Sequence, residues 1–99
     1  MIKVKLLKEN NILKEIFMTG HANFDSYGKD IVCASASSIV ITTINAIETL
    51  DKEAIKYDDN KGVHIKVIKN NDITNKLLDN MINLLEELES DYPKTIKFL

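Results

Sequence analysis

The chain has 99 residues, of which 44% are apolar and 28% charged, and its formal net charge at pH 7 is −2. This length predicts one domain over residues 1–99, and this composition excludes an intrinsically disordered chain. Lysines and acids are interspersed without a basic block, so we expect no direct contact with nucleic acid.

The N-terminus alternates apolar and polar residues instead of forming the apolar core of a signal peptide. No run approaches the roughly 18 consecutive apolar residues of a membrane span. The single cysteine excludes an internal disulfide. We therefore expect a soluble cytoplasmic protein with no membrane partner.

The first twenty residues predict a β-hairpin. Residues 2–7 alternate with period two, as a strand with one buried face does. Asn10 and Asn11 then favour a tight turn, because asparagine tolerates the left-handed backbone conformation. Leu13 to Thr19 forms the second predicted strand. The pattern then stops from Gly20 to Lys29, which predicts a long loop of the kind that often has a function.

Asp30 begins a predicted helix that ends at about Leu50, because its carboxylate can cap the first turn. Apolar residues recur at three- and four-residue steps and define one apolar face. The opposite face is only weakly polar, so the helix is expected to be buried on more than one side. The residues assigned to the apolar face are Val32, Ala36, Ile39, Val40, Thr43, Ile47 and Leu50, with Ile31 and Ile44 assigned to the opposite face.

The second half predicts a hairpin, a helix and a last strand. Ala54–Tyr57 and Val63–Ile68 flank a turn rich in Asp, Asn and Gly. A leucine-rich stripe predicts a helix from about Asp72 to Ser90, and Thr95–Leu99 alternates as a strand does. The order is β-β-α-β-β-α-β. It indicates an α/β protein of the α+β type, with a mixed sheet packed against two helices.

Cys33 lies at about the third position of the first predicted helix. Unpaired N–H groups and partial positive charge at a helix N-terminus favour a thiolate, which makes this cysteine a candidate nucleophile. The alternative is a small buried hydrophobic residue. His21 precedes it by twelve residues and could exchange a proton with the thiol, or could simply be satisfied at the edge of the loop.

Three further residues could support such a pair. Gly20 could allow a close backbone approach or a positive φ angle, or it could terminate the strand. Asp30 is expected to cap the helix and could also orient His21. Ser37 lies one turn beyond Cys33 on the same helix face and could bond to the site or allow tight packing.

Other kinds of site find little support in the sequence. His64 shares a strand face with Lys66, and we expect that face to be exposed to solvent. One cysteine and two scattered histidines are poor evidence for a metal site, and the glycines match no nucleotide-binding fingerprint. We therefore expect neither a metal nor another cofactor.

Two motifs closely resemble the ribosomal-processing cysteine protease family called Prp. The first is Gly20-His21-Ala22, and the second runs from Tyr27 through Gly28-Lys29-Asp30-Ile31-Val32-Cys33 to Ala34. Their order and spacing match the family, and the resemblance covers essentially the whole chain. Ser35 departs from it, because the family usually has a second alanine there.

The resemblance implies a cysteine endopeptidase that removes the N-terminal extension of a large-subunit ribosomal protein. It implies that Cys33 is the nucleophile, that His21 is the general base and acid, and that Gly20, Asp30 and Ser37 support them. It also implies a homodimer with a mobile loop over the site. We expect the loop from Ala22 to Lys29 to close over the substrate, with Phe24 or Tyr27 contacting its apolar side chains.

Two other functions remain open at this point. The chain could be a ribosome-associated module that binds the same protein without cutting it. It could also be a thiol redox sensor that uses an activated Cys33, although the chain contains no second cysteine to resolve the oxidised thiol.

Overall fold

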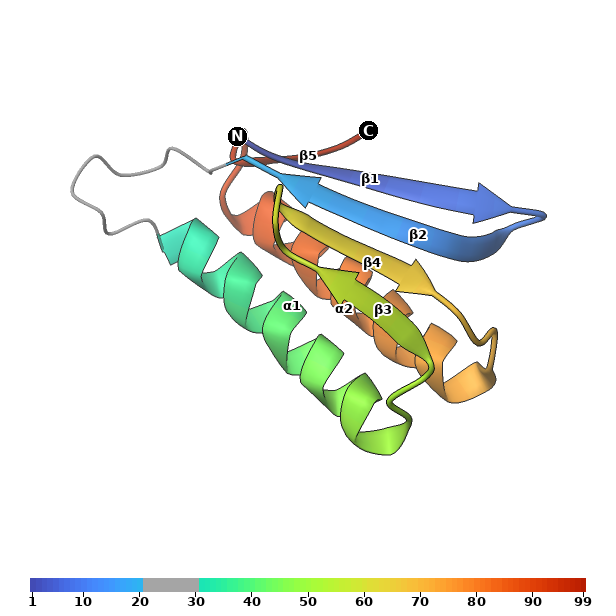
Figure 1. Cartoon of the computed structure of the whole chain (residues 1–99). Helices are drawn as coiled ribbons and strands as arrows, with labels where there is room; N and C mark the ends of the chain where they lie inside the picture. Colours follow the sequence, from blue (N-terminus) through green and yellow to red (C-terminus); the bar gives the residue numbers. More distant parts are fainter. Residues whose placement is uncertain (21–30) are drawn as a thin grey trace.

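A single sheet with two helices on one of its faces makes up the described part of the chain, residues 1–20 and 31–99 of a computed structural model (Figure 1). The predicted order β-β-α-β-β-α-β and the α+β class are confirmed. The strands are β1 (Ile2–Glu9), β2 (Ile12–Thr19), β3 (Ile55–Asp58), β4 (Val63–Val67) and β5 (Ile96–Phe98), and the helices are α1 (Ile31–Leu50) and α2 (Asp72–Asp91).

The sheet is mixed, as predicted, with the strand order β3-β4-β2-β1-β5. β5 runs parallel to β1, and the other neighbouring pairs are antiparallel. Asn10 and Asn11 form the β1–β2 turn with φ angles of 53° and 64°, the left-handed conformation that the sequence predicts there. Both strands of this hairpin extend slightly beyond their predicted limits, and a bulge interrupts their register between Leu7 and Lys8.

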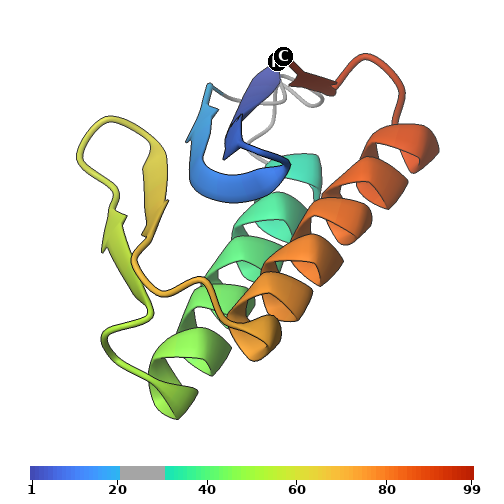
Figure 2. The same cartoon turned by 90° about the vertical axis from the view of Figure 1, so that its right-hand side faces the viewer.

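The two helices lie side by side against the same face of the sheet (Figure 2). The core fills the space between these layers, and its side chains come from the inner positions of β1, β2, β3, β4 and β5 and from both helices. α1 packs against α2 as well as against the sheet, which confirms that it is buried on more than one side.

The predicted faces of α1 are wrong at two positions. Ile44 is buried although it was assigned to the weakly polar side, because it lies one helical turn beyond the buried Val40. Leu50 is 65% exposed in the last turn, where the helix extends past its packing partners. The helix itself begins and ends where the sequence predicts, to within one residue.

The second helix follows its prediction closely. Asn71 caps it, and the Asn71 side chain accepts a hydrogen bond of 2.8 Å from the backbone N–H of Thr74. Leu78, Met81 and Leu85 lie on one stripe and are completely buried, so this stripe is part of the core.

Among the described residues, α1 is long and apolar enough to cross a membrane when judged by length and composition alone. This is weak evidence, because a core helix of a globular domain passes the same test. In this fold α1 buries six residues against the sheet and α2.

Candidate active site

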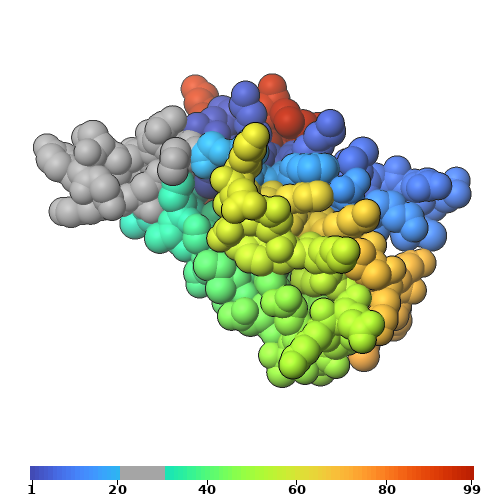
Figure 3. Space-filling model, in the orientation of Figure 1, coloured from blue at the N-terminus to red at the C-terminus, as the bar shows by residue number. Residues whose placement is uncertain are grey.

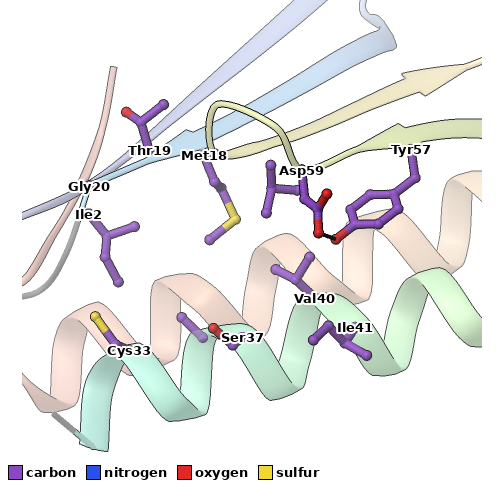
Figure 4. A pocket seen from close by; sticks show the side chains of 13 residues that line it. Ile2, Met18, Thr19, Gly20, Cys33, Ser37, Val40, Ile41, Tyr57 and Asp59 are labelled. Atoms are coloured by element: carbon purple, nitrogen blue, oxygen red, sulfur yellow. Dashed lines mark hydrogen bonds between the residues drawn. The ribbon is translucent and has the colours of Figure 1, made fainter. Parts of the chain in front are cut away.

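Cys33 is the third residue of α1 and is half-buried at the start of the helix. Its thiol points away from the helix axis toward the end of the sheet where Ile2 and Gly20 lie (Figure 4). Backbone N–H groups in the first turn of a helix have no acceptor within the helix, and together they carry a partial positive charge. This position favours the anionic form of a thiol, as the sequence predicts.

A cavity of about 310 Å³ extends from Cys33 along one side of α1 (Figure 4). The helix contributes residues at three- and four-residue steps, which is the spacing of a single helix face. Opposite them lie inner-face residues from the ends of β1, β2 and β4. The helix side is lined by Cys33, Ala36, Ser37, Val40 and Ile41, and the sheet side includes Ile2, Met18, Thr19, Gly20, Gly62 and Val63.

The β3–β4 hairpin forms the far end of the cavity and contributes the polar side chains of Tyr57 and Asp59 to its wall. The tip of this hairpin extends beside the end of β2 (Figure 3). Tyr57 donates a hydrogen bond of 3.3 Å from its hydroxyl to Oδ2 of Asp59. Partial burial and the neighbouring Asp59 carboxylate raise the pKa of the Tyr57 phenol, so the hydroxyl stays protonated and remains a donor.

Gly20 follows β2 at the edge of this cavity and has a backbone conformation that residues with a side chain rarely adopt. Its φ angle is +88°, and a Cβ atom built on it would lie 2.4 Å from the carbonyl oxygen of Met1. Gly20 has the positive φ angle considered from the sequence and directly follows the last residue of β2, and the backbone that approaches it is that of Met1. Gly20 itself lines the same cavity as Cys33.

Ser37 lies in the same cavity as Cys33 and on the same side of α1, which confirms the predicted placement. His21, Asp30, Phe24 and Tyr27 lie outside the described residues. Their roles, and the closing of the loop from Ala22 to Lys29, stay predictions.

His64 lies on the opposite face of the sheet from the cavity, beside Lys66 in β4, as the sequence predicts. Its Nε2 atom is 2.8 Å from Oε1 of Glu15, and its ring stacks on Phe17 with the centroids 4.4 Å apart. The two neighbours leave only 37% of the His64 side chain exposed. One of the two histidines of the chain is therefore held away from Cys33 by its own contacts.

Sequence reasoning missed most of the cavity wall. Ile2 and Met18 were recognised only as strand residues, and Tyr57 and Asp59 only as parts of a hairpin. The sequence did contain a signal for Tyr57, because it lies two residues after the buried Ile55 in β3 and therefore shares its face, which is turned toward the helices. Within residues 1–20 and 31–99, no group of three or more His, Cys, Asp or Glu side chains could hold a metal ion.

Comparison with known proteins shows the family of the chain. The family model described as cysteine protease Prp matches residues 1–97 of the chain. The chain belongs to this family. The predicted cysteine peptidase is thereby confirmed, and Cys33 is the one cysteine of the chain.

Individual Prp proteins are similar over nearly the full length. The ribosomal processing cysteine protease Prp of Staphylococcus aureus is 37% identical, and the match covers 98% of this chain and 96% of the relative. A crystal structure of the S. aureus protease with a covalently linked product peptide has a TM-score of 0.85 at 37% identity and covers 99% and 97% of the two chains. A second S. aureus structure, with a substrate peptide, has a TM-score of 0.81 at 35% identity and covers 100% and 98%.

Proposed function

We propose that this Prp protease removes the N-terminal extension of a large-subunit ribosomal protein, with Cys33 as nucleophile and His21 as general base and acid. The observation that carries the proposal is the position of Cys33 in the first turn of α1, facing a cavity that Gly20 also lines. His21 follows Gly20 directly in the chain, whereas His64 is engaged with Glu15 on the other side of the sheet. The S. aureus Prp structures with substrate and product peptides support a peptide as the ligand.

In the first half of the reaction, His21 takes the proton of the Cys33 thiol. The sulfur attacks the peptide carbonyl carbon, and the carbonyl oxygen becomes an oxyanion. The oxyanion then collapses, the C–N bond breaks, and His21 delivers the proton to the departing amine. The N-terminal fragment stays attached to Cys33 as a thioester.

Water completes the reaction. His21 removes a proton from the water as its oxygen attacks the thioester, and a second oxyanion forms and collapses. The C–S bond breaks, the carboxylic acid leaves, and the proton returns to the sulfur. The thiol is regenerated, so no oxidant or reductant is needed.

Backbone N–H groups of the first turn of α1 stabilise both oxyanions in this proposal, together with an N–H near Gly20. Such donors are already fixed before the reaction and lie where negative charge develops, so they lower the energy of the transition state. Asp30 caps the helix and orients His21, and Ser37 supports the cysteine. The loop from Ala22 to Lys29 closes over the peptide, and Phe24 or Tyr27 contacts its apolar side chains.

The cavity supports an apolar peptide segment as the substrate. Ile2, Met18 and Val40 provide an apolar wall beside Cys33. The Tyr57–Asp59 pair at the far end offers a phenol and a carboxylate to the peptide backbone or to a polar side chain. An apolar side chain therefore enters near the sulfur, and a polar group lies farther along α1.

The test is cleavage of a peptide that spans the N-terminal extension, followed by mass spectrometry of the products. Wild type is expected to release two fragments, and Cys33→Ala and His21→Ala are each expected to release none. His64→Ala is the matched histidine control, and we expect it to cleave at the wild-type rate. Cleavage that survives Cys33→Ala contradicts the mechanism, and binding without cleavage by wild type indicates the non-catalytic module.

A pH series of Cys33 alkylation tests the pair directly. A histidine partner is expected to keep the thiol reactive at lower pH in wild type and in His64→Ala than in His21→Ala. Equal pH profiles for all three proteins would show that His21 does not activate the Cys33 thiol. Reversible inactivation by peroxide, with full function after His21→Ala, would instead indicate the redox sensor.

We also propose that the protein is a homodimer and is located in the cytoplasm. Large apolar side chains exposed on the helices support self-association, among them Ile31 at 46% and Leu84 at 38% exposure. Light scattering is expected to give twice the chain mass of 11.2 kDa, and a single-chain mass would contradict the dimer.

A further inference from the structure

The face of the sheet opposite the helices carries an excess of positive charge. Successive strands bring their outward-pointing positions together on this face, although these positions are far apart in the sequence. Three acids at outward positions of the described strands, Glu9, Glu15 and Asp58, share the face. We call this surface the lysine face, after its exposed lysines Lys3, Lys5, Lys56, Lys66 and Lys97.

Contacts with described residues do not neutralise these lysines. None of the five forms an ion pair with another residue in the described parts of the chain. Glu15 instead interacts with His64 at 2.8 Å. The positive charge of the lysine face therefore remains available to an external anion.

The net charge of −2 conceals this asymmetry. α2 carries six carboxylates and one lysine, so it has an excess of negative charge on the other side of the molecule. The expectation of no nucleic acid contact was based on the absence of a continuous basic block. A sheet needs no such block, because lysines at every second position of a strand share one face with lysines of neighbouring strands.

The lysines form two groups, one on β5 and β1 and the other on β4 and β3, separated by β2, where Glu15 is the direct neighbour of Lys66. Lys97 and Lys3 are direct neighbours on β5 and β1, and Lys66 and Lys56 are direct neighbours on β4 and β3. Neighbouring strands lie about 4.8 Å apart, and alternate residues of one strand lie roughly 7 Å apart. A polymer with regularly repeated negative charges can contact several of these cations at once.

Aromatic rings between the two lysine pairs favour a nucleic acid over an acidic protein surface. Phe17 and His64 are paired across β2 and β4, and their rings are stacked with an interplanar angle of 6°. Lys5 is the neighbour of Phe17 on the β1 side. Both rings are half-buried, and each covers one face of the other. The ring surface that remains accessible lies among the lysines, and sheet-based single-strand binders likewise combine aromatic contacts to bases with lysine contacts to phosphates.

We propose that the lysine face binds single-stranded RNA. The phosphates contact the five lysines, and a base stacks against the exposed surface of the Phe17–His64 pair. The cavity beside Cys33 lies on the other side of the sheet and stays open to a peptide. This inference stands on its own observations, and its test does not use peptidase activity.

The test is fluorescence anisotropy of a labelled single-stranded RNA of about 15 nucleotides, titrated with wild-type protein from about 50 to 200 mM salt. Contact of phosphates with the five lysines predicts a slope of log K against log salt of roughly −3.5, because each contact contributes about 0.7 on a single strand. Lys5→Gln/Lys66→Gln is expected to weaken binding about 10-fold and to make the slope shallower by about 1.4. Lys52→Gln/Lys76→Gln removes the same charge from the helical side and is expected to leave the affinity within about twofold of wild type.

A second variant tests the stacking. Phe17→Leu keeps an apolar side chain but removes the ring, and we expect it to weaken binding about 5-fold or more with the salt slope unchanged. Thermal melting of each variant separates a loss of contact from a loss of fold. The proposal is overturned if RNA does not bind at low salt, if both double variants weaken binding equally, or if Phe17→Leu binds like wild type. Equal competition by a poly-glutamate peptide also overturns it, because it indicates an acidic protein partner.

Discussion

At the scale of a single residue, the main feature is the position of Cys33 in the first turn of α1, where it lines the cavity. A helix-starting cysteine could be identified from the sequence, because the apolar pattern that begins at Val32 fixes the first turn of α1 to within one residue. What could not be predicted is the wall opposite the thiol. Ile2 and Met18 reach it only through the pairing of β1 with β2 and the packing of α1 on that hairpin.

The positive φ angle of Gly20 is a second feature at the residue scale, and it can be tested by substitution. Gly20→Ala is expected to destabilise the fold by about 1–3 kcal/mol, because a side chain at φ +88° is strained and its Cβ atom would meet the carbonyl oxygen of Met1. Urea unfolding measures the loss, and the exposed neighbour Thr19→Ala serves as the control. Unfolding of Gly20→Ala at the wild-type midpoint would show that this backbone conformation is not required.

At the scale of elements, the sequence predicted each strand and helix but not their neighbours in the sheet. The hairpins follow from Asn10 and Asn11 and from the turn before Gly62, since these residues tolerate left-handed backbone angles. The pairing of β2 with β4 and of β1 with β5 depends on contacts between distant segments, which no local pattern encodes. For the same reason the sequence did not reveal that five lysines converge on one face.

The cavity between α1 and the sheet carries the second prediction. Ile41 lines the cavity but is 52% exposed, so Ile41→Gln should leave the fold intact while removing apolar surface from the substrate contact. Loss of about 1–2 kcal/mol of apolar contact predicts a KM higher by roughly 5- to 30-fold with kcat little changed. Steady-state cleavage of an apolar peptide measures both constants.

The matched control for this variant is Ile73→Gln. Ile73 is 60% exposed on α2 and does not line the cavity beside Cys33. Its KM is expected to equal that of wild type. An equal rise in KM for both variants would show that the effect does not come from the cavity.

The junction between α1 and β4 carries a prediction about pH. Asp51 accepts a hydrogen bond from Lys69 Nζ at 2.9 Å and another from the backbone N–H of Glu53 at 2.9 Å. These contacts, with that from Lys69 the larger, hold the pKa of the Asp51 carboxyl below its ordinary value of 3.8. The carboxylate therefore adds stability above that value, and this contribution is lost as the pH falls through the lower pKa of the folded state.

Asp51→Asn tests this dependence. We expect a slightly lower melting temperature than wild type at pH 7, and a difference that shrinks as the pH falls below about 3.8. The effect is small because both partners are accessible to solvent, and added salt should reduce it further. Asp79→Asn removes the same charge from α2 as a control. A difference that grows toward acid pH would contradict the assigned direction.

At the scale of the whole molecule, one hydrophobic core supports both the cavity beside Cys33 and the lysine face. The helices and the inner face of the sheet share a single cluster of buried side chains, so the cavity and the lysine face lie on two sides of one layer. The free energy of unfolding of a domain of this size is only about 5–10 kcal/mol. Local damage anywhere in the core is therefore expected to reach the site around Cys33.

Leu78→Ala tests this coupling. Leu78 is completely buried in α2 and does not line the cavity, and its truncation is expected to cost about 2–5 kcal/mol. If the core unfolds as one unit, circular dichroism and peptide cleavage should fail at the same lowered temperature, because α1 cannot hold Cys33 against the sheet once α2 is lost. Leu50→Ala removes a leucine that is 65% exposed and should shift neither transition measurably. Cleavage that outlasts the loss of helical signal in Leu78→Ala would mean that β1, β2 and α1 form the site without α2, and the single-core account would be wrong.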